Sequence, residues 1–111
     1  MAYNESLADR VRRLMAREAR AGITERKMFG GICFMLRGRM VCGVLGDDLV
    51  VRVGPGEYER ALEKPHARAM DFTGPPLRGF VYVGPGGVRT GAALATWARR
   101  ALAFVSSLRK K

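Results

Sequence analysis

The chain of 111 residues is long enough to bury one hydrophobic core and too short for two, so we expect a single domain over residues 1–111. A hydrophobic share of 48% is typical of a globular protein and excludes wholesale disorder. Charges interrupt the N-terminal residues where a signal peptide needs an apolar core, and no apolar stretch approaches the roughly 18 residues of a membrane span. We therefore expect a cytoplasmic protein that does not associate with membranes.

The charge is strongly positive and unevenly spread. Lysine and arginine total 20 against 10 acidic residues, a net charge of +10. Residues 77–111 contain seven of the basic side chains and no acidic one. A polyanionic partner is one interpretation of this excess. The other is a surface that keeps the protein soluble, in a sequence where 16 of the 20 basic residues are arginine.

The first predicted element is an amphipathic helix over residues 4–21. Leu7, Val11 and Leu14 recur at helical spacing, and arginines occupy the other positions. Asn4 or Ser6 can cap its start. These features predict a helix that lies on the protein surface and buries one face.

Three short apolar runs over residues 27–53 predict an antiparallel meander. The runs are separated by "RGR" and "GDD", which contain the turn residues that hairpins need. If residues 37–38 form a two-residue loop, Cys33 lies directly opposite Cys42, with Cα atoms about 4.5 Å apart. Reduced, buried thiols are expected for this pair, and a redox-responsive disulfide is the alternative. Both faces of the hairpin are apolar, which predicts a homodimer or another burying contact on the face that helices leave uncovered.

The second half of the chain predicts a short helix, two further strands and a long final helix. Gly54 permits a corner, Pro55 suits a first helical turn, and the short helix runs to about Lys64. Residues 91–108 have a wide apolar stripe that includes Trp97, which favours a core position over a base-stacking platform. The expected element order is α-β-β-β-α-β-β-α. It predicts an α+β domain in which helices pack on an antiparallel sheet of about five strands.

Two adjacent glycines in "KMFGGICFML" raise the question of a phosphate-binding loop. Such a loop places its glycines between a strand and a helix N-terminus, whereas further strand sequence follows these two. We therefore predict a bulge, a sharp coil of the strand, or a place where a helix passes close because no side chain intervenes. The exposed backbone around them is a candidate contact for a partner strand or a ligand. The candidate residues are Lys27, Met28, Phe29, Gly30 and Gly31.

Catalytic and metal chemistry find little support in the sequence. Two cysteines and one histidine are too few for a tetrahedral zinc site or a disulfide framework. His66 and the pair Asp47–Asp48 are predicted to be solvated loop residues, and no nucleophile and base are evidently brought together. We therefore expect no enzyme, no metal site and no cofactor.

A family resemblance follows from three stretches taken together. They are "KMFGG" at residues 27–31, "RVGP" at 52–55, and "MDFTG" through "GFVYV" at 70–83. Their order and spacing resemble the TfoX N-terminal domain family, named after the bacterial regulators of natural competence, over roughly residues 8–110. The competence regulators have a second, helical domain after this one, whereas this sequence stops at Lys111. The resemblance thus implies a stand-alone TfoX-like domain that acts through protein contacts in transcriptional regulation, with no catalytic residues to carry over.

Two functions remain open on the sequence. The resemblance favours a protein-interaction module whose partner the sequence does not identify. The charge favours a basic nucleic-acid-binding protein, although no zinc finger, helix-turn-helix pair or RNA-binding signature is present. The final helix and tail are expected to form a solvent-facing basic surface, with no acidic residue on the same element to neutralise it, that binds nucleic acid weakly and without sequence preference. The residues of this surface are Arg99, Arg100, Arg109, Lys110 and Lys111.

Overall fold

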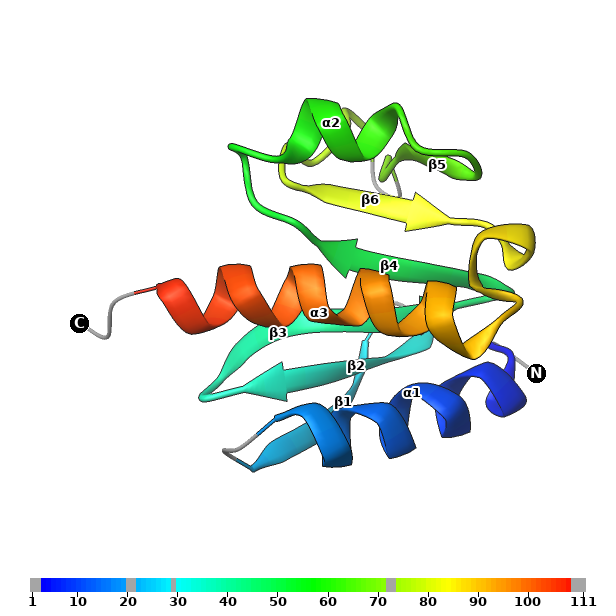
Figure 1. Ribbon diagram of the computed structural model, residues 1–111, viewed down its shortest axis with the longest axis vertical. Coiled ribbons are helices and arrows are strands. Elements are labelled where there is room, and N and C mark those ends of the chain that lie inside the picture. The colour runs from blue at the N-terminus through cyan, green and yellow to red at the C-terminus, as the bar shows by residue number, and fades with distance from the viewer. Residues whose placement is uncertain (1–2, 20–21, 29, 72–73, 109–111) are drawn as a thin grey trace.

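A computed structural model describes residues 3–19, 22–28, 30–71 and 74–108 (Figure 1). The predicted α+β class with an antiparallel sheet is confirmed, with six strands where about five were expected. The first half contains α1 (Glu5–Glu18), β1 (Ile23–Met28), β2 (Gly31–Leu36), β3 (Arg39–Leu45) and β4 (Asp48–Arg52). The second half contains α2 (Tyr58–Leu62), β5 (Ala67–Ala69), β6 (Phe80–Val83), a 3-10 helix η1 (Pro85–Val88) and α3 (Gly91–Ser107).

The strands form one sheet in the order β1-β2-β3-β4-β6-β5, with every neighbouring pair antiparallel. Strand β1 is the element that the sequence did not predict. It lies at the edge of the sheet, and its four central residues, 24–27, are exposed. An exposed edge strand needs no alternation of apolar side chains, and its charges discourage pairing with another chain. Hydrophobic periodicity therefore gave no signal for it.

The helices pack on one face of the sheet. In Figure 1, α3 runs across the middle of the sheet, α1 lies beside it over the β1–β2 side, and α2 lies beyond β6. One core cluster joins buried side chains of all three helices to alternate residues of the strands. Its largest fully buried members include Met15, Phe34, Leu49, Val51 and Val81. Trp97 belongs to the same cluster, which confirms the predicted core position.

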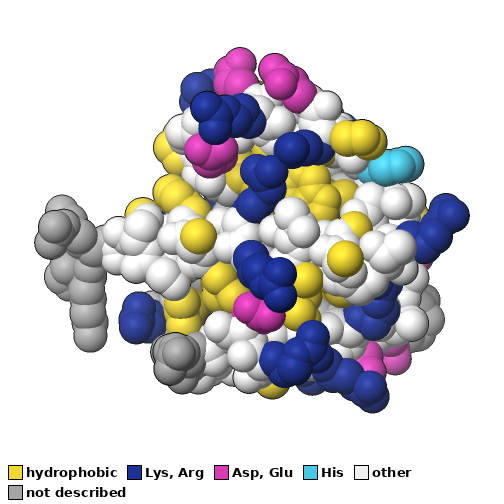
Figure 2. All heavy atoms as spheres, in the orientation of Figure 1, with side chains coloured by type: hydrophobic (Ala, Val, Ile, Leu, Met, Phe, Trp, Pro, Cys, Tyr) yellow, Lys and Arg dark blue, Asp and Glu magenta, His cyan; other side chains and the backbone are white. Residues whose placement is uncertain are grey.

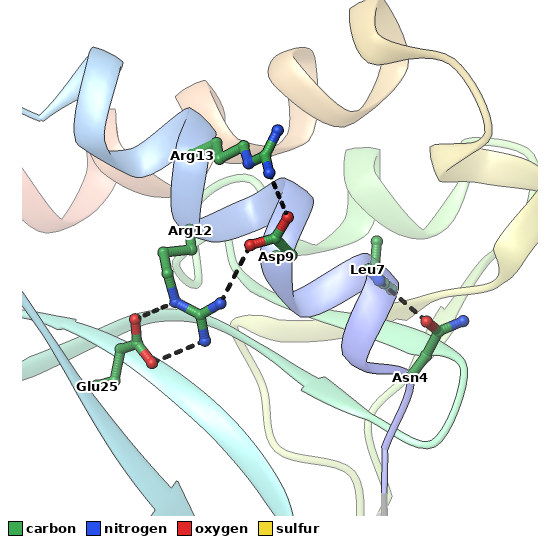
Figure 3. Close-up of polar contacts among 6 residues, drawn as sticks. All are labelled: Asn4, Leu7, Asp9, Arg12, Arg13 and Glu25. Carbon is green, nitrogen blue, oxygen red and sulfur yellow. Dashed lines mark hydrogen bonds and ion pairs between the residues drawn. The ribbon is translucent and has the colours of Figure 1, made fainter.

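An N-cap and a side-chain contact with strand β1 hold helix α1 in place. The backbone N–H of Leu7 donates to the side-chain oxygen of Asn4 at 2.9 Å, which makes Asn4 the N-cap (Figure 3). Arg12 donates two hydrogen bonds to Glu25 of β1, at 2.5 and 2.9 Å, and these bonds lower the pKa of the Glu25 carboxyl. The helix ends at Glu18, three residues before its predicted end.

The two glycines lie where β1 turns into β2, with Gly30 in the turn and Gly31 at the start of β2. Gly30 has a φ of +79°, a conformation that favours glycine, and a Cβ on Gly31 would lie 2.2 Å from the carbonyl oxygen of Val44. The backbone does bend here, but at a turn between two strands, and the element that passes close to Gly31 is strand β3 and not a helix. The expectation that both glycines lie inside one continuous strand is wrong, because β1 ends at Met28 and β2 begins at Gly31.

The predicted pairing of the two cysteines is wrong by one residue. Cys33 pairs with Gly43 and Phe34 with Cys42, because the register of β2 against β3 shifts between Phe34 and Met35. A shift of one residue turns a side chain to the other face of a sheet, so the two thiols lie on opposite faces. Both cysteines are free and buried. Burial raises the pKa of Cys42 to about 12 and also raises the pKa of Cys33.

On the face of the sheet opposite the helices, apolar side chains pack mainly against one another. A smaller cluster of Val50, Met70 and Tyr82 lies there, with Met40, Leu45 and Phe80 packed against it. Among the described residues, Leu77 is the one large hydrophobic side chain that is exposed, at 47%. The predicted exposed apolar patch is therefore wrong for this part of the chain. The homodimer that was inferred from it stays a prediction.

Candidate interaction groove between helices α2 and α3

A groove separates α2 from α3 on the helical face of the molecule. Three adjoining hollows, with volumes of about 610, 300 and 380 Å³, are all lined by Arg100. Figure 2 shows hydrophobic side chains at the surface between α2 and α3, with Lys and Arg side chains around them. We call this feature the α2–α3 groove. Arg60, Lys64 and His66 lie along one wall, and Ala93, Arg100 and Phe104 along the other.

The groove is open because α2 is short and the side of α3 that faces it has mainly small side chains. Helix α2 has only five residues, and Pro65 follows soon after its end. The side of α3 that faces it includes Ala93, Thr96 and Ala103, which recur at spacings of three or more residues along one helical face. These side chains are too short to fill the space toward α2. The sequence therefore leaves the groove unfilled.

Trp97 forms part of the groove floor as well as the core. Its side chain is 6% exposed and lines the hollow at the His66 end. The guanidinium of Arg100 lies over its ring, 5.5 Å from the centroid. This cation–π contact holds Arg100 above an apolar floor. Sequence reasoning found the core role of Trp97 and missed its position in the groove.

His66 closes one end of the groove against the 3-10 helix η1. Its φ is +71°, and its carbonyl oxygen accepts a hydrogen bond from the N–H of Gly84 at 2.9 Å. A Cβ on Gly86 would lie 2.5 Å from the imidazole ring, and one on Gly87 would lie 3.0 Å from the Cβ of His66. The glycines of "PGG" therefore let the histidine pack on η1. His66 is exposed, as the sequence predicted.

The charges of the groove differ between its two ends. The hollow at the His66 end contains Lys64 and Arg100 and no carboxylate among its lining residues. Neither cation forms an ion pair with any residue that the structure describes. In the adjoining hollows, Glu57 and Glu63 also line the groove, and Glu57 lies 3.7 Å from Arg60. The His66 end is therefore the positive end.

The structure brings together only part of the predicted basic surface. Arg99, next to Arg100, donates to both carboxylate oxygens of Glu18 at 3.2 and 3.0 Å. These hydrogen bonds lower the pKa of Glu18. The expectation of an unneutralised basic surface is therefore wrong at Arg99, because α1 supplies a carboxylate that α3 itself lacks. Arg109, Lys110 and Lys111 lie outside the described residues.

The candidate contact residues around the two glycines do not line the groove. Lys27 and Met28 end β1, Gly30 lies in the turn, and Gly31 begins β2. Phe29 lies outside the described residues. The structure therefore separates the two sets of predicted interaction residues: one belongs to the β1–β2 turn, and Arg100 alone of the described set belongs to the groove.

Within residues 3–19, 22–28, 30–71 and 74–108, no group of three or more histidine, cysteine, aspartate or glutamate side chains could hold a metal ion. In the same residues, no helix has the length and apolar character needed to cross a membrane.

Comparison with known families gives one match. Residues 15–105 match the family described as the TfoX N-terminal domain, which covers most of the chain. The chain therefore belongs to the TfoX N-terminal domain family, and the resemblance found in the sequence is confirmed. No curated protein and no solved structure matches the chain significantly. The family relates the domain to competence regulation rather than to a catalysed reaction.

Proposed function

We propose that this member of the TfoX N-terminal domain family is a non-catalytic protein-interaction module in transcriptional or competence-type regulation, and that its partner binds in the α2–α3 groove. The observation that carries the proposal is the pair of unpaired cations, Lys64 and Arg100, beside a floor formed by Trp97. Protein interfaces are enriched in tryptophan and arginine, which supply most of the binding energy where they lie in a concave surface. The groove has both residues in contact.

The chemistry of the groove supports binding rather than reaction. Catalysis by side chains needs a nucleophile or acid in contact with a base. The described lining of the positive end consists of cations, small side chains, backbone glycines and one indole ring, with His66 at its edge. Such groups hold and orient a partner. The regulatory character of the family points in the same direction.

Site-specific photocross-linking in the native host tests the proposal. Thr96 is exposed and lines the groove, whereas Ser106 is exposed on the same helix and does not line it. A photoreactive phenylalanine analogue at position 96 should yield a discrete adduct that protease removes and nuclease leaves intact. The same analogue at position 106 should not. Equal adducts at both positions, or an adduct that nuclease destroys, would contradict the proposal and favour the nucleic-acid function.

The regulatory part of the proposal needs its own measurement. Ala93→Arg fills the groove, and Ala92→Arg adds the same side chain at an exposed neighbouring position that does not line it. Cells with Ala93→Arg should show an altered set of transcripts relative to cells with Ala92→Arg. Identical transcript profiles in the two strains would show that the groove has no regulatory role.

A further inference from the structure

We propose that the positive end of the α2–α3 groove receives an acidic segment of the partner protein, with a carboxylate between Lys64 and Arg100 and an adjoining apolar side chain on the Trp97 floor. This inference rests on the proposed function and adds the chemistry of the partner. It is argued from the charges, the stacking and the size of the hollow at the His66 end.

Lys64 and Arg100 form no ion pair with a carboxylate of the described residues, and several other basic side chains, Arg89 among them, also form none. What distinguishes Lys64 and Arg100 is that both line one hollow beside an apolar floor. Six arginines elsewhere on the surface are paired with acidic neighbours. The arginines that form such ion pairs are Arg12, Arg13, Arg60, Arg68, Arg78 and Arg99. Arg100 instead contacts the indole ring of Trp97, and Lys64 lines the same hollow. The hollow therefore has two positive charges and supplies no negative one.

The position of Arg100 suits a carboxylate. A guanidinium that lies over an aromatic ring keeps its N–H donors directed outward in its own plane, where a carboxylate can accept two of them. The ring contact also restricts the side chain before the partner arrives, which lowers the entropy lost on binding. Helix α3 begins at Gly91, and Ala93 of its first turn lines the hollow, so the positive end of the helix dipole adds to the attraction for an anion.

The size and floor of the hollow point to a side chain next to the carboxylate. Its volume of about 300 Å³ lies at the lower end of the range for ligand sites, enough for one or two side chains and too small for a whole helix. Pro65, Ala93 and Trp97 provide apolar surface within it. A segment in which aspartate or glutamate adjoins an aromatic or aliphatic residue fits both the two cations and the apolar floor of the hollow. A nucleic-acid backbone offers repeated phosphates and would leave the apolar floor unused.

Selection from a library of short random peptides displayed on phage, with the whole chain as target, tests this inference. Trp97 is the only tryptophan, so its fluorescence reports binding at the hollow directly. Selected peptides should be enriched in aspartate and glutamate next to apolar residues and should change the Trp97 emission. Arg100→Glu should weaken their binding roughly tenfold or more, because a desolvated charge pair becomes a repulsive one. Arg89→Glu is the matched control, since Arg89 is exposed, lies near the start of α3 and does not line the hollow.

The outcomes separate this inference from the proposed function. Peptides that lose binding in Ala93→Arg but show no acidic enrichment, or that bind Arg100→Glu unchanged, would overturn the inference and leave the groove as a protein-binding site. If no selected peptide depends on position 93, both are contradicted. If oligo(dT) changes the Trp97 emission at physiological salt and displaces the peptides, the hollow binds nucleic acid and the inference is wrong. Circular dichroism of each variant verifies that it is folded.

Discussion

Helix α3 faces its two neighbouring helices, α1 and α2, in different ways: the gap toward α1 is closed by an ion pair, and the gap toward α2 is open. Toward α1, the gap is bridged by Arg99, which donates to Glu18 in the last turn of a helix of 14 residues. Toward α2, the neighbouring side chain Arg100 has no carboxylate partner among the described residues, and a helix of five residues leaves a groove. Figure 2 shows hydrophobic side chains at the surface on both sides of α3, with Lys or Arg side chains beside them.

This difference shows that neighbouring arginines on one helix acquire different contacts from the elements beside them. Consecutive residues point about 100° apart around a helix, so Arg99 and Arg100 face different neighbours. One neighbour supplies a carboxylate and enough length to pack along α3. The other is a shorter helix, and the carboxylates at its ends, Glu57 and Glu63, line the groove without forming an ion pair with Arg100. A side closed by an ion pair and an open side, where we propose that a partner binds, thus lie on the same element.

The largest effect is expected at the floor of the open side. Trp97→Ala removes a side chain that is 6% exposed and belongs to the main core. We expect the free energy of unfolding to fall by about 3–5 kcal/mol, as for other large-to-alanine changes in cores. Urea unfolding followed by circular dichroism measures it. Trp97→Phe keeps an aromatic ring and should lower the free energy of unfolding clearly less. Equal losses for the two variants would show that packing of the aromatic ring does not account for the stability.

A smaller loss is expected where α3 meets the corner before α2. Gly54 has a φ of +88°, and a Cβ there would lie 2.4 Å from the ring of Phe104. We expect Gly54→Ala to lower the free energy of unfolding by about 2–3 kcal/mol through strain and overpacking together. Gly56→Ala is the control, because nothing lies within 4 Å of its Cβ position and its φ is not positive. In a Phe104→Ala background the cost of Gly54→Ala should shrink; an unchanged cost would assign it wholly to the backbone.

The sequence predicted the buried face of α3 better than the contacts along its two sides. Apolar spacing in residues 91–108 identified the buried stripe with Trp97, because burial of one helical face is a local and periodic property. The same reasoning could not find the Arg99–Glu18 pair, whose members lie 81 residues apart, or the groove, which results from what α2 fails to cover. Likewise, a single register shift between Phe34 and Met35 overturned the cysteine pairing. Local sequence patterns therefore predict helices and strands, whereas the ion pair, the groove and the cysteine pairing depend on contacts between residues far apart in the sequence.

Acid should weaken the closed side selectively. Arg99 lowers the pKa of Glu18 below its ordinary value of 4.5, so the carboxylate favours the folded state when it is ionised. That stability is fully present above the pKa of Glu18 in the unfolded chain and is lost as the pH falls through its lower pKa in the folded protein. The urea midpoint of the wild-type protein should therefore exceed that of Arg99→Gln slightly near pH 7, and the difference should vanish in acid. High salt should also reduce it, because the pair is exposed. A difference that is unchanged across this pH range would show that the ion pair is not its cause.

The weakest expected effect concerns polyanions on the open side. We expect the protein to be retained weakly on heparin or DNA at low salt and released near physiological salt, because contact with a few phosphates is opposed by counterions. Arg100→Gln should reduce the slope of the logarithm of the binding constant against the logarithm of the salt concentration, by the amount expected for about one phosphate contact. The reason is that no described carboxylate neutralises the charge of Arg100. Arg99→Gln should leave the slope unchanged, because its charge is already paired with Glu18. Equal slopes for both variants would show that polyanions do not distinguish the two sides of α3. Sequence-selective binding that persists at physiological salt would make nucleic-acid recognition the function, because base readout requires side chains delivered into a groove of the nucleic acid rather than phosphate contact alone.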